Sequence, residues 1–172
     1  MVLYVTQDEV QSLVDITDAV QALDGAFAGW GDEAADNLER SRLDLPRGSL
    51  NVMAAMLPGG DIFGYRAYAP AVGRYNLLNL LSVKEGGLIA LIECGWLSTT
   101  RTGAASGVAT RHMAREDAKH MGVIGSGRTA TDQVRAVAAV RALERVTVYS
   151  KTPENRQAFA DNMSAELGIP VE

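Results

Sequence analysis

Apolar residues at the start of the chain recur with the period of a helix. Between Val20 and Trp30 they are spaced by three and four residues, which predicts a helix from Asp18 to about Trp30. Ahead of that helix, Thr6-Gln7-Asp8-Glu9 has the sequence of a capping box, in which the hydroxyl and the carboxylate each accept from the other residue's amide. A short helix is therefore expected to begin there.

From Leu43 to Glu93 the pattern changes to short apolar runs separated by glycine and proline. The runs are Asn51–Met56, Ile62–Tyr68, Leu77–Val83 and Leu88–Glu93. The separating sequences are Pro58-Gly59-Gly60, Pro70 to Gly73, and Lys84 to Gly87. Runs of this length between turn sequences predict an antiparallel sheet built of hairpins.

Small residues dominate the stretch from Gly103 to Ala109, which contains almost no bulky side chains. We interpret it as a helix whose small residues let another group approach its backbone closely. The alternative is a tightly packed connecting helix.

The last third of the chain has the order strand, glycine turn, helix, strand, helix. The predicted elements are a strand at His120–Ile124, the turn Gly125-Ser126-Gly127, a helix from Thr129 to about Leu143, a strand at Val146–Tyr149, a helix capped by Thr152 and closed by Gly168, and the start of a third strand at Ile169–Glu172. A complete dinucleotide-binding domain has five or six parallel strands. The chain is therefore expected to be the front part of a longer protein, or to have its sheet completed by another polypeptide.

The turn carries a dinucleotide-binding fingerprint of the form G-x-G-x-x-A. Gly125 permits a tight turn, Gly127 lets the backbone approach a pyrophosphate, and Ala130 lets the helix pack close to the strand. The helix N-terminus offers its amides to the anion. These residues predict a site for a nicotinamide or flavin dinucleotide, and the alternative is a glycine turn without a ligand.

The end of the second strand bears on the choice of cofactor. Ser150 lies where an acidic residue would hold the ribose 2′-hydroxyl of NAD, and Lys151 follows it. A hydroxyl and a lysine leave room and charge for a 2′-phosphate, so NADP is slightly favoured over NAD. The alternative for Lys151 is a solvated surface side chain.

Composition narrows the class of protein. The 172 residues carry 16 Lys+Arg against 21 Asp+Glu, a net charge of −5, and the basic residues are scattered, which speaks against a nucleic-acid partner. The most apolar stretch, Gly87–Leu97, is too short and too polar to span a membrane. One cysteine and two histidines predict no metal site and a cytoplasmic location, and Cys94 is expected to be a small core residue.

Arg42, Arg66 and Arg101 each lie in or beside an apolar segment, where a guanidinium requires a partner. Converging on a cleft, they would bind a substrate carboxylate. The alternative is internal ion pairing with Asp44 or Glu93.

Several segments together resemble the ornithine cyclodeaminase/mu-crystallin family over essentially the whole chain. They are Arg42-Leu43-Asp44-Leu45-Pro46, Gly64-Tyr65-Arg66, Leu88 to Glu93, the block Arg101-Thr102-Gly103-Ala104-Ala105-Ser106, and Val123-Ile124-Gly125-Ser126-Gly127. The resemblance implies an α/β protein with an N-terminal α+β substrate and dimerisation domain (residues 1–116). An incomplete Rossmann domain that binds NAD(H) or NADP(H) would follow (residues 117–172).

The family's shared step implies hydride transfer between nicotinamide and the α-carbon of a small amino or imino acid, in a homodimer. By resemblance Arg42 and Arg101 bind the substrate carboxylate, and Arg128 and Thr129 lie on the cofactor phosphates. Arg66 replaces a lysine near the reacting amine, which makes it the candidate catalytic residue.

An arginine does not readily exchange a proton at neutral pH, so carboxylate binding is the other role for Arg66. The aspartate that cyclodeaminases use lies beyond Glu172, so this chain alone is expected to be inactive. The rival function is a binding protein of the mu-crystallin kind, or an inactive fragment.

Overall fold

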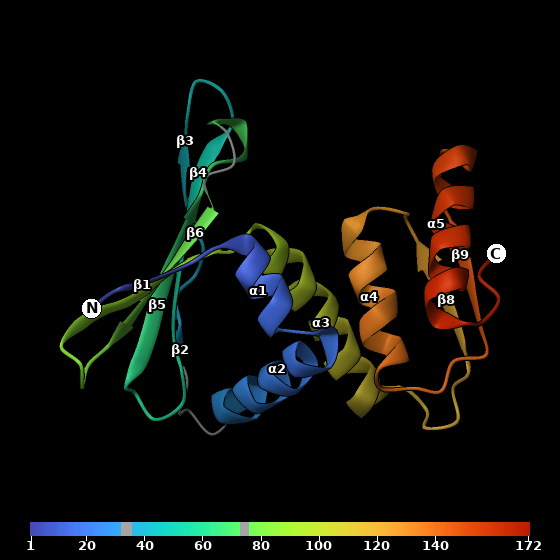
Figure 1. Ribbon diagram of the computed structural model, residues 1–172, viewed down its shortest axis with the longest axis horizontal. Coiled ribbons are helices and arrows are strands. Elements are labelled where there is room, and N and C mark those ends of the chain that lie inside the picture. Colours follow the sequence, from blue (N-terminus) through green and yellow to red (C-terminus); the bar gives the residue numbers. More distant parts are fainter. Residues whose placement is uncertain (32–35, 73–75) are drawn as a thin grey trace. The chain divides into compact units, whose positions relative to one another are not determined.

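The computed structural model describes residues 1–31, 36–72 and 76–172 (Figure 1). Within them the chain forms two compact units. The first contains residues 1–14 and 24–98, and the second contains residues 15–23 and 99–172. Two helices, α2 (Ile16–Gly31) and α3 (Gly95–Met113), each contribute residues to both units.

The capping box predicted at Thr6 is present. The Thr6 hydroxyl accepts from the amide of Glu9, and the Glu9 carboxylate accepts from the amide of Thr6, so α1 (Gln7–Leu13) begins where its sequence indicates. Helix α2 begins at Ile16, two residues earlier than predicted. Asp15 and Asp18 cap its first turn, because each carboxylate accepts from the other residue's amide.

The first unit is built on a sheet of seven strands in the order β1-β7-β6-β5-β4-β2, with β3 also paired to β4. The strands are β1 (Leu3–Val5), β2 (Asp36–Asn37), β3 (Ser41–Asp44), β4 (Ser49–Met56), β5 (Ile62–Tyr68), β6 (Asn76–Ser82) and β7 (Gly87–Glu93). All four predicted strands are confirmed, and neighbours from β4 to β7 run antiparallel as expected.

Three short strands were not predicted. β1 pairs in parallel with β7, while β2 and β3 each pair with a different part of β4. Runs of two to four residues are too short to show an alternating pattern, and β1 depends on a partner far along the chain. Of the predicted turn Pro70 to Gly73, Pro70–Val72 form a 3₁₀ turn, and Gly73 lies outside the described residues.

The second unit contains two parallel strands, β8 (His120–Ile124) and β9 (Arg145–Tyr149), with α4 (Arg128–Ala138) and α5 (Pro153–Leu167). The predicted third strand begins where the sequence indicated, because Val171 forms a parallel bridge to Val146. The sheet order is therefore third strand, β9, β8, which is the order of the first half of a dinucleotide-binding sheet.

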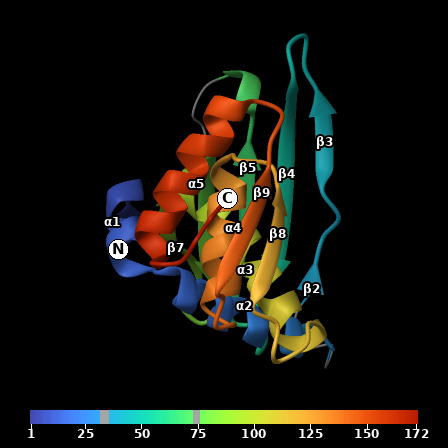
Figure 2. The same ribbon diagram turned by 90° about the vertical axis from the view of Figure 1, so that its right-hand side faces the viewer.

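Helices α4 and α5 pack on one face of these strands (Figure 2). Val123, Val146 and Val148 point to that face, where they meet Val134 of α4 and Met163 of α5 in one buried cluster. The alternate strand residues are exposed, among them Ile124 and Tyr149. Helix α5 turns Phe159 and Met163 toward this cluster, where both are buried.

The end of α4 was predicted wrongly. The helix stops at Ala138 instead of near Leu143, and Arg141 then turns back onto the end of α3. Its Nη2 donates to the carbonyl of Thr110 at 2.8 Å and to that of Ala114 at 2.9 Å. The Arg141 guanidinium thus caps the C-terminal end of α3 through hydrogen bonds to its backbone carbonyls.

The cap of α5 also differs from the prediction. Thr152 occupies the N-cap position and Pro153 follows it, but the Thr152 side chain makes no capping hydrogen bond. Gly168 closes the helix in the left-handed conformation (φ 69°), as predicted.

The small residues of α3 do admit a close neighbour, and that neighbour is α4. A Cβ on Gly103 would lie 2.5 Å from the carbonyl carbon of Asp132, and one on Gly107 would lie 2.8 Å from the carbonyl oxygen of Ala136. Because these clashes are with backbone atoms, neither helix can yield by a side-chain rotation.

We expect Gly103→Val to destabilise the second unit by about 3 kcal/mol, because the added side chain forces α3 and α4 apart. Thermal and urea unfolding measure the effect. The matched control is Gly25→Ala in α2, where a new Cβ meets nothing within 4 Å. That variant should raise stability by about 0.5 to 1 kcal/mol. Equal stability of Gly103→Val and wild type would contradict the packing described for α3.

Candidate functional site

The glycine turn between β8 and α4 is fixed by one unusual backbone conformation and one hydrogen bond. Gly125 has φ +107°, a value that side chains rarely allow, so this position requires glycine. The Gly125 amide donates to the carbonyl of Tyr149 at 2.7 Å. The turn is thereby tied to the carboxyl end of β9.

Gly127 differs from Gly125, because the chain's own structure does not require glycine there. Its φ of −91° is open to any residue, and a Cβ would meet nothing within 4 Å. Gly127 is the N-cap of α4 and supplies no side chain to the first amides of that helix. The residues therefore fit a pyrophosphate, which would occupy the open space and accept from these amides.

Ala130 completes the fingerprint as the sequence predicted. Its side chain is 7% exposed and belongs to the buried cluster beside Val123 and Val148. A small side chain here lets the first turn of α4 lie directly on the strands.

The residues predicted to meet the adenosine ribose lie beside the turn. The Ser150 hydroxyl is 2.9 Å from the hydroxyl of Ser126, and Arg156 Nη1 donates to the carbonyl of Ser150 at 3.2 Å. Lys151 is exposed. Arg156, which the sequence interpretation did not include, brings a second positive charge to this end of β9.

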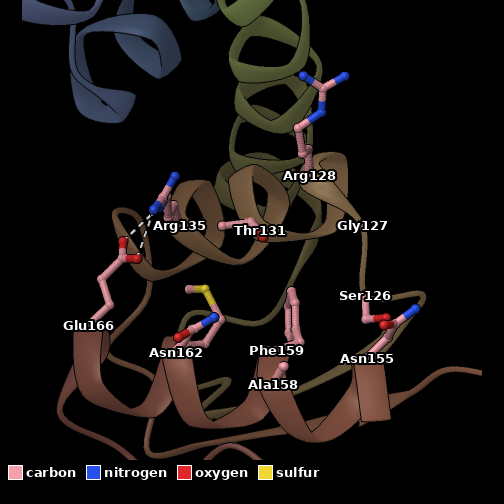
Figure 3. A pocket seen from close by; sticks show the side chains of 11 residues that line it. Ser126, Gly127, Arg128, Thr131, Arg135, Asn155, Ala158, Phe159, Asn162 and Glu166 are labelled. Carbon is pink, nitrogen blue, oxygen red and sulfur yellow. Dashed lines mark hydrogen bonds and ion pairs between the residues drawn. The ribbon is translucent and has the colours of Figure 1, made fainter. Parts of the chain in front are cut away.

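A cleft of about 600 Å³ runs between α4 and α5 (Figure 3). Of the predicted cofactor residues, Gly127 and Arg128 line it, together with Ser126. Gly125, Thr129, Ser150 and Lys151 are not among its lining residues. Arg128 and Thr129 are both exposed on the first turn of α4.

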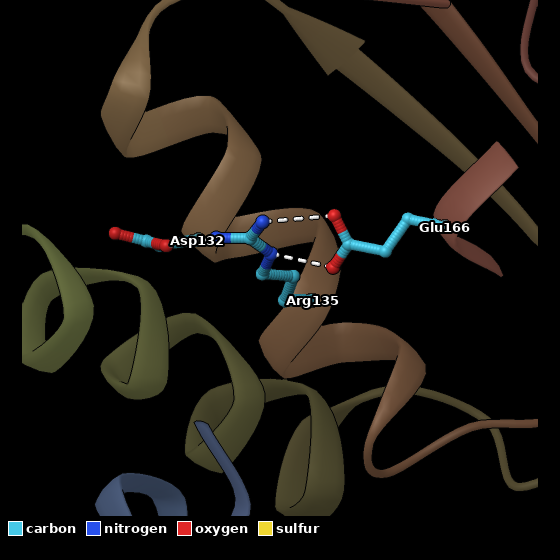
Figure 4. A network of polar contacts seen from close by, with 3 residues as sticks. All are labelled: Asp132, Arg135 and Glu166. Carbon is cyan, nitrogen blue, oxygen red and sulfur yellow. Dashed lines mark hydrogen bonds and ion pairs between the residues drawn. The ribbon is translucent and has the colours of Figure 1, made fainter. Parts of the chain in front are cut away.

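The far end of the cleft is closed by an ion pair that sequence reasoning missed (Figure 4). Arg135 of α4 donates through Nε and Nη2 to the two carboxylate oxygens of Glu166 of α5, at 2.6 and 2.8 Å. Arg135 Nη1 also reaches Asp132 at 3.2 Å. Hydrogen bonding to Arg135 lowers the pKa of Glu166, and the carboxylates raise the pKa of Arg135.

Arg42 and Arg66 lie on the same face of the sheet in the first unit. Residues that pair in register lie on the same face of a sheet, and Arg42 pairs with Asn51, which pairs with Tyr68. Arg66 is two residues before Tyr68 on β5, so its side chain is on that face too. Their backbones are about 12 Å apart, within the combined reach of two arginine side chains. Arg101 belongs to α3 in the second unit.

The partners of these arginines are partly those predicted. Arg42 Nε donates to Asp44 at 3.0 Å, in a pair whose side chains are both exposed, so the internal ion pair considered for Arg42 is present. Glu93 instead accepts from the hydroxyl of Tyr4 and the amide of Gln7, which lowers its pKa. Arg66 is half-buried, and its Nε donates to Asn76 Oδ1 at 2.7 Å.

Two further findings concern metals and membranes. Within residues 1–31, 36–72 and 76–172, no group of three or more His, Cys, Asp and Glu is placed to hold a metal ion. None of the helices in the same ranges has both the length and the apolar character needed to cross a membrane.

The sequence matches the ornithine cyclodeaminase/mu-crystallin family over residues 2–172, and the chain belongs to that family. A Delta(1)-pyrroline-2-carboxylate reductase of Bacillus cereus is 42% identical over 96 residues, which cover 56% of this chain and 30% of that protein.

Two solved structures share the fold over nearly the whole chain. A Delta(1)-pyrroline-2-carboxylate reductase from Thermococcus litoralis, in complex with NADH and L-proline, is 30% identical with a TM-score of 0.84, covering 98% of this chain and 55% of that one. An archaeal alanine dehydrogenase dimer with bound NAD is 26% identical with a TM-score of 0.89, covering 99% of this chain and 55% of that one. The chain thus spans about half the length of these proteins.

We expect Glu166→Gln to lower stability at neutral pH by about 1 kcal/mol, because a partly exposed ion pair between α4 and α5 is lost. A carboxyl whose pKa is lowered by folding stabilises the fold above its ordinary value of 4.5, and this contribution disappears as the pH falls through the folded value. The difference in Tm between wild type and variant should therefore shrink in acid. A difference independent of pH would show that the pair does not stabilise the unit.

Proposed function

We propose that the protein to which this chain belongs is a nicotinamide-dependent oxidoreductase or cyclodeaminase. It would transfer hydride between the cofactor and the α-carbon of a small amino or imino acid. The observation that carries the proposal is the turn at Gly125 and Gly127, where a helix N-terminus without a side-chain cap faces open space. Family membership and the NADH and NAD complexes of similar proteins support it.

The cofactor would be held by the first turn of α4 and by the end of β9. The amides after Gly127 would donate to the pyrophosphate, and the exposed Arg128 and Thr129 would lie on the phosphates. Ser150 and Lys151 would meet the adenosine ribose, with NADP slightly favoured over NAD because a lysine complements a 2′-phosphate. The nicotinamide, when bound, supplies the hydride chemistry.

The substrate carboxylate would be bound by Arg42, Arg66 and Arg101. Arg42 and Arg66 share one face of the sheet, which supports a common ligand for these two. Because a guanidinium stays protonated near neutral pH, Arg66 would orient the substrate and stabilise its negative charge. Arg66 would therefore contact the reacting substrate without accepting or releasing a proton.

Residues 1–116 would form the substrate and dimerisation domain, and residues 117–172 the first part of the Rossmann domain. On the sheet face opposite Arg66, Met56, Phe63 and Tyr65 are each more than a third exposed. Such a surface favours a second copy of the chain, as does the dimer of the similar alanine dehydrogenase. A cytoplasmic location stays a prediction.

The rival is a protein of the mu-crystallin kind that binds dinucleotide or a small carboxylate without turnover, or an inactive fragment. Absorbance at 340 nm, measured on the protein expressed from its native gene, separates the proposed enzyme from these rivals. The panel is L-alanine, L-proline, L-ornithine and L-lysine with NAD and NADP, and keto acids plus amines with NADH and NADPH. Cofactor binding without turnover across this panel would favour the rival. The 172-residue chain alone is expected to show no turnover.

Gly127→Ala should weaken NADH and NADPH binding by about tenfold or more, since the methyl group enters the space proposed for the pyrophosphate. Its Tm should not fall, because the new Cβ touches no described residue. Fluorescence titration and thermal unfolding measure the two effects. Gly122→Ala on β8 is the matched control, also without neighbours at its Cβ, and should bind both cofactors normally. Unchanged affinity in Gly127→Ala would place the cofactor elsewhere.

Arg101→Leu should weaken binding of the amino acid substrate by about 3 kcal/mol, a rise in Kd on the order of 100-fold, if this guanidinium anchors the carboxylate. Calorimetric titration with the four amino acids above tests it. Arg111→Leu, on the same helix, is the control and should bind as wild type does. Equal Kd values for Arg101→Leu and wild type would mean that the carboxylate site lies away from Arg101.

A further inference from the structure

The side chain of Arg66 is fixed by two neighbours on the same face of the sheet. Asn76 Oδ1 accepts from Arg66 Nε at 2.7 Å, and the guanidinium carbon lies 4.4 Å from the centre of the Tyr68 ring. Tyr68 and Asn76 are directly paired in register on β5 and β6. Asn76 therefore contacts the guanidinium at its edge, and Tyr68 covers one of its flat faces.

Asn76 is itself held by the buried Cys94. The Cys94 thiol lies 3.1 Å from Asn76 Oδ1 and 3.3 Å from the Asn76 carbonyl, and the Cys94 amide donates to that carbonyl at 3.0 Å. A guanidinium can only donate, so the atom of Asn76 that faces Arg66 must be the amide oxygen. Both the position and the orientation of this amide are thus determined.

We propose that Asn76 is a positioning residue, which sets Arg66 so that it binds the substrate carboxylate end-on through Nη1 and Nη2. A guanidinium offers a carboxylate two bidentate edges, one formed by Nε with an Nη and one formed by the two Nη atoms. Asn76 occupies Nε and leaves only the second edge. Among the described residues, Nη1 and Nη2 of Arg66 have no hydrogen-bond partner.

This inference rests on the proposed function and adds a structural requirement to it. A long arginine side chain loses rotamer freedom when it binds a ligand, and prior fixation lowers that loss. Tyr68 and Asn76 provide such fixation before substrate arrives. Substrate affinity should therefore depend on Asn76, although Asn76 does not contact the substrate.

The test uses Asn76→Ala in the protein expressed from its native gene, with the same four amino acids as probes. Their Kd should rise about tenfold, while the Kd for NADH or NADPH stays unchanged. In an Arg66→Met background the same substitution should raise Kd less than twofold, because its effect acts through Arg66. By NMR, the Arg66 Nε–H should exchange slowly in wild type and quickly in Asn76→Ala.

Asn79→Ala is the matched control, since Asn79 lies on β6 but pairs with Tyr65 on the opposite face of the sheet. It should leave the Kd values and the Arg66 signal as in wild type. Amino acid binding that is equal in wild type and Asn76→Ala overturns the inference and leaves the proposed function standing. Additive losses in the Arg66→Met background also overturn it, because they indicate a general structural role. A wild-type protein that binds neither dinucleotide nor any of the four amino acids overturns both.

Discussion

The hydrogen bond from the amide of Gly125 to the carbonyl of Tyr149 joins the end of β8 to the end of β9, and the candidate cofactor site depends on it. Parallel pairing brings both carboxyl ends to one edge, so the turn, Ser126 and Ser150 lie together. The following helix then begins at Gly127 with its amides directed to that edge. The backbone of the turn thus fixes where the first amides of α4 lie.

Close packing between the backbones of α3 and α4 fixes the helix that follows this turn. Gly103 and Gly107 let α3 lie against Asp132 and Ala136 of α4, and Arg141 closes the end of α3 through carbonyl hydrogen bonds. The Arg135 and Glu166 pair ties α4 to α5 at the far end of the cleft. Helix α4 is thus held by backbone contacts, by a buried apolar cluster and by an ion pair, each on a different part of its surface.

The arginines of the first unit show how a sheet can carry charge on a half-buried face. Arg66 is stabilised by an amide oxygen and an aromatic ring in place of a carboxylate, so its charge is solvated without being neutralised. Arg42, by contrast, pairs with Asp44 at an exposed position.

The sequence by itself determined the elements whose signals are local. The capping box at Thr6, the four main strands of the sheet, the glycine turn and the left-handed Gly168 all depend on residues a few positions apart, and each is present. The family was also readable, because its Arg-Thr-Gly-Ala-Ala-Ser block and its glycine turn are contiguous.

Only the tertiary structure decided what depends on residues distant in the chain. The pairing of β1 with β7, the early end of α4, the Arg135 and Glu166 pair and the contact of Asn76 with Arg66 and Cys94 leave no periodic trace in the sequence. The physical reason is that such contacts depend on the register of strands and the packing of helices. A short strand or a single polar side chain acquires its partner only when these are fixed.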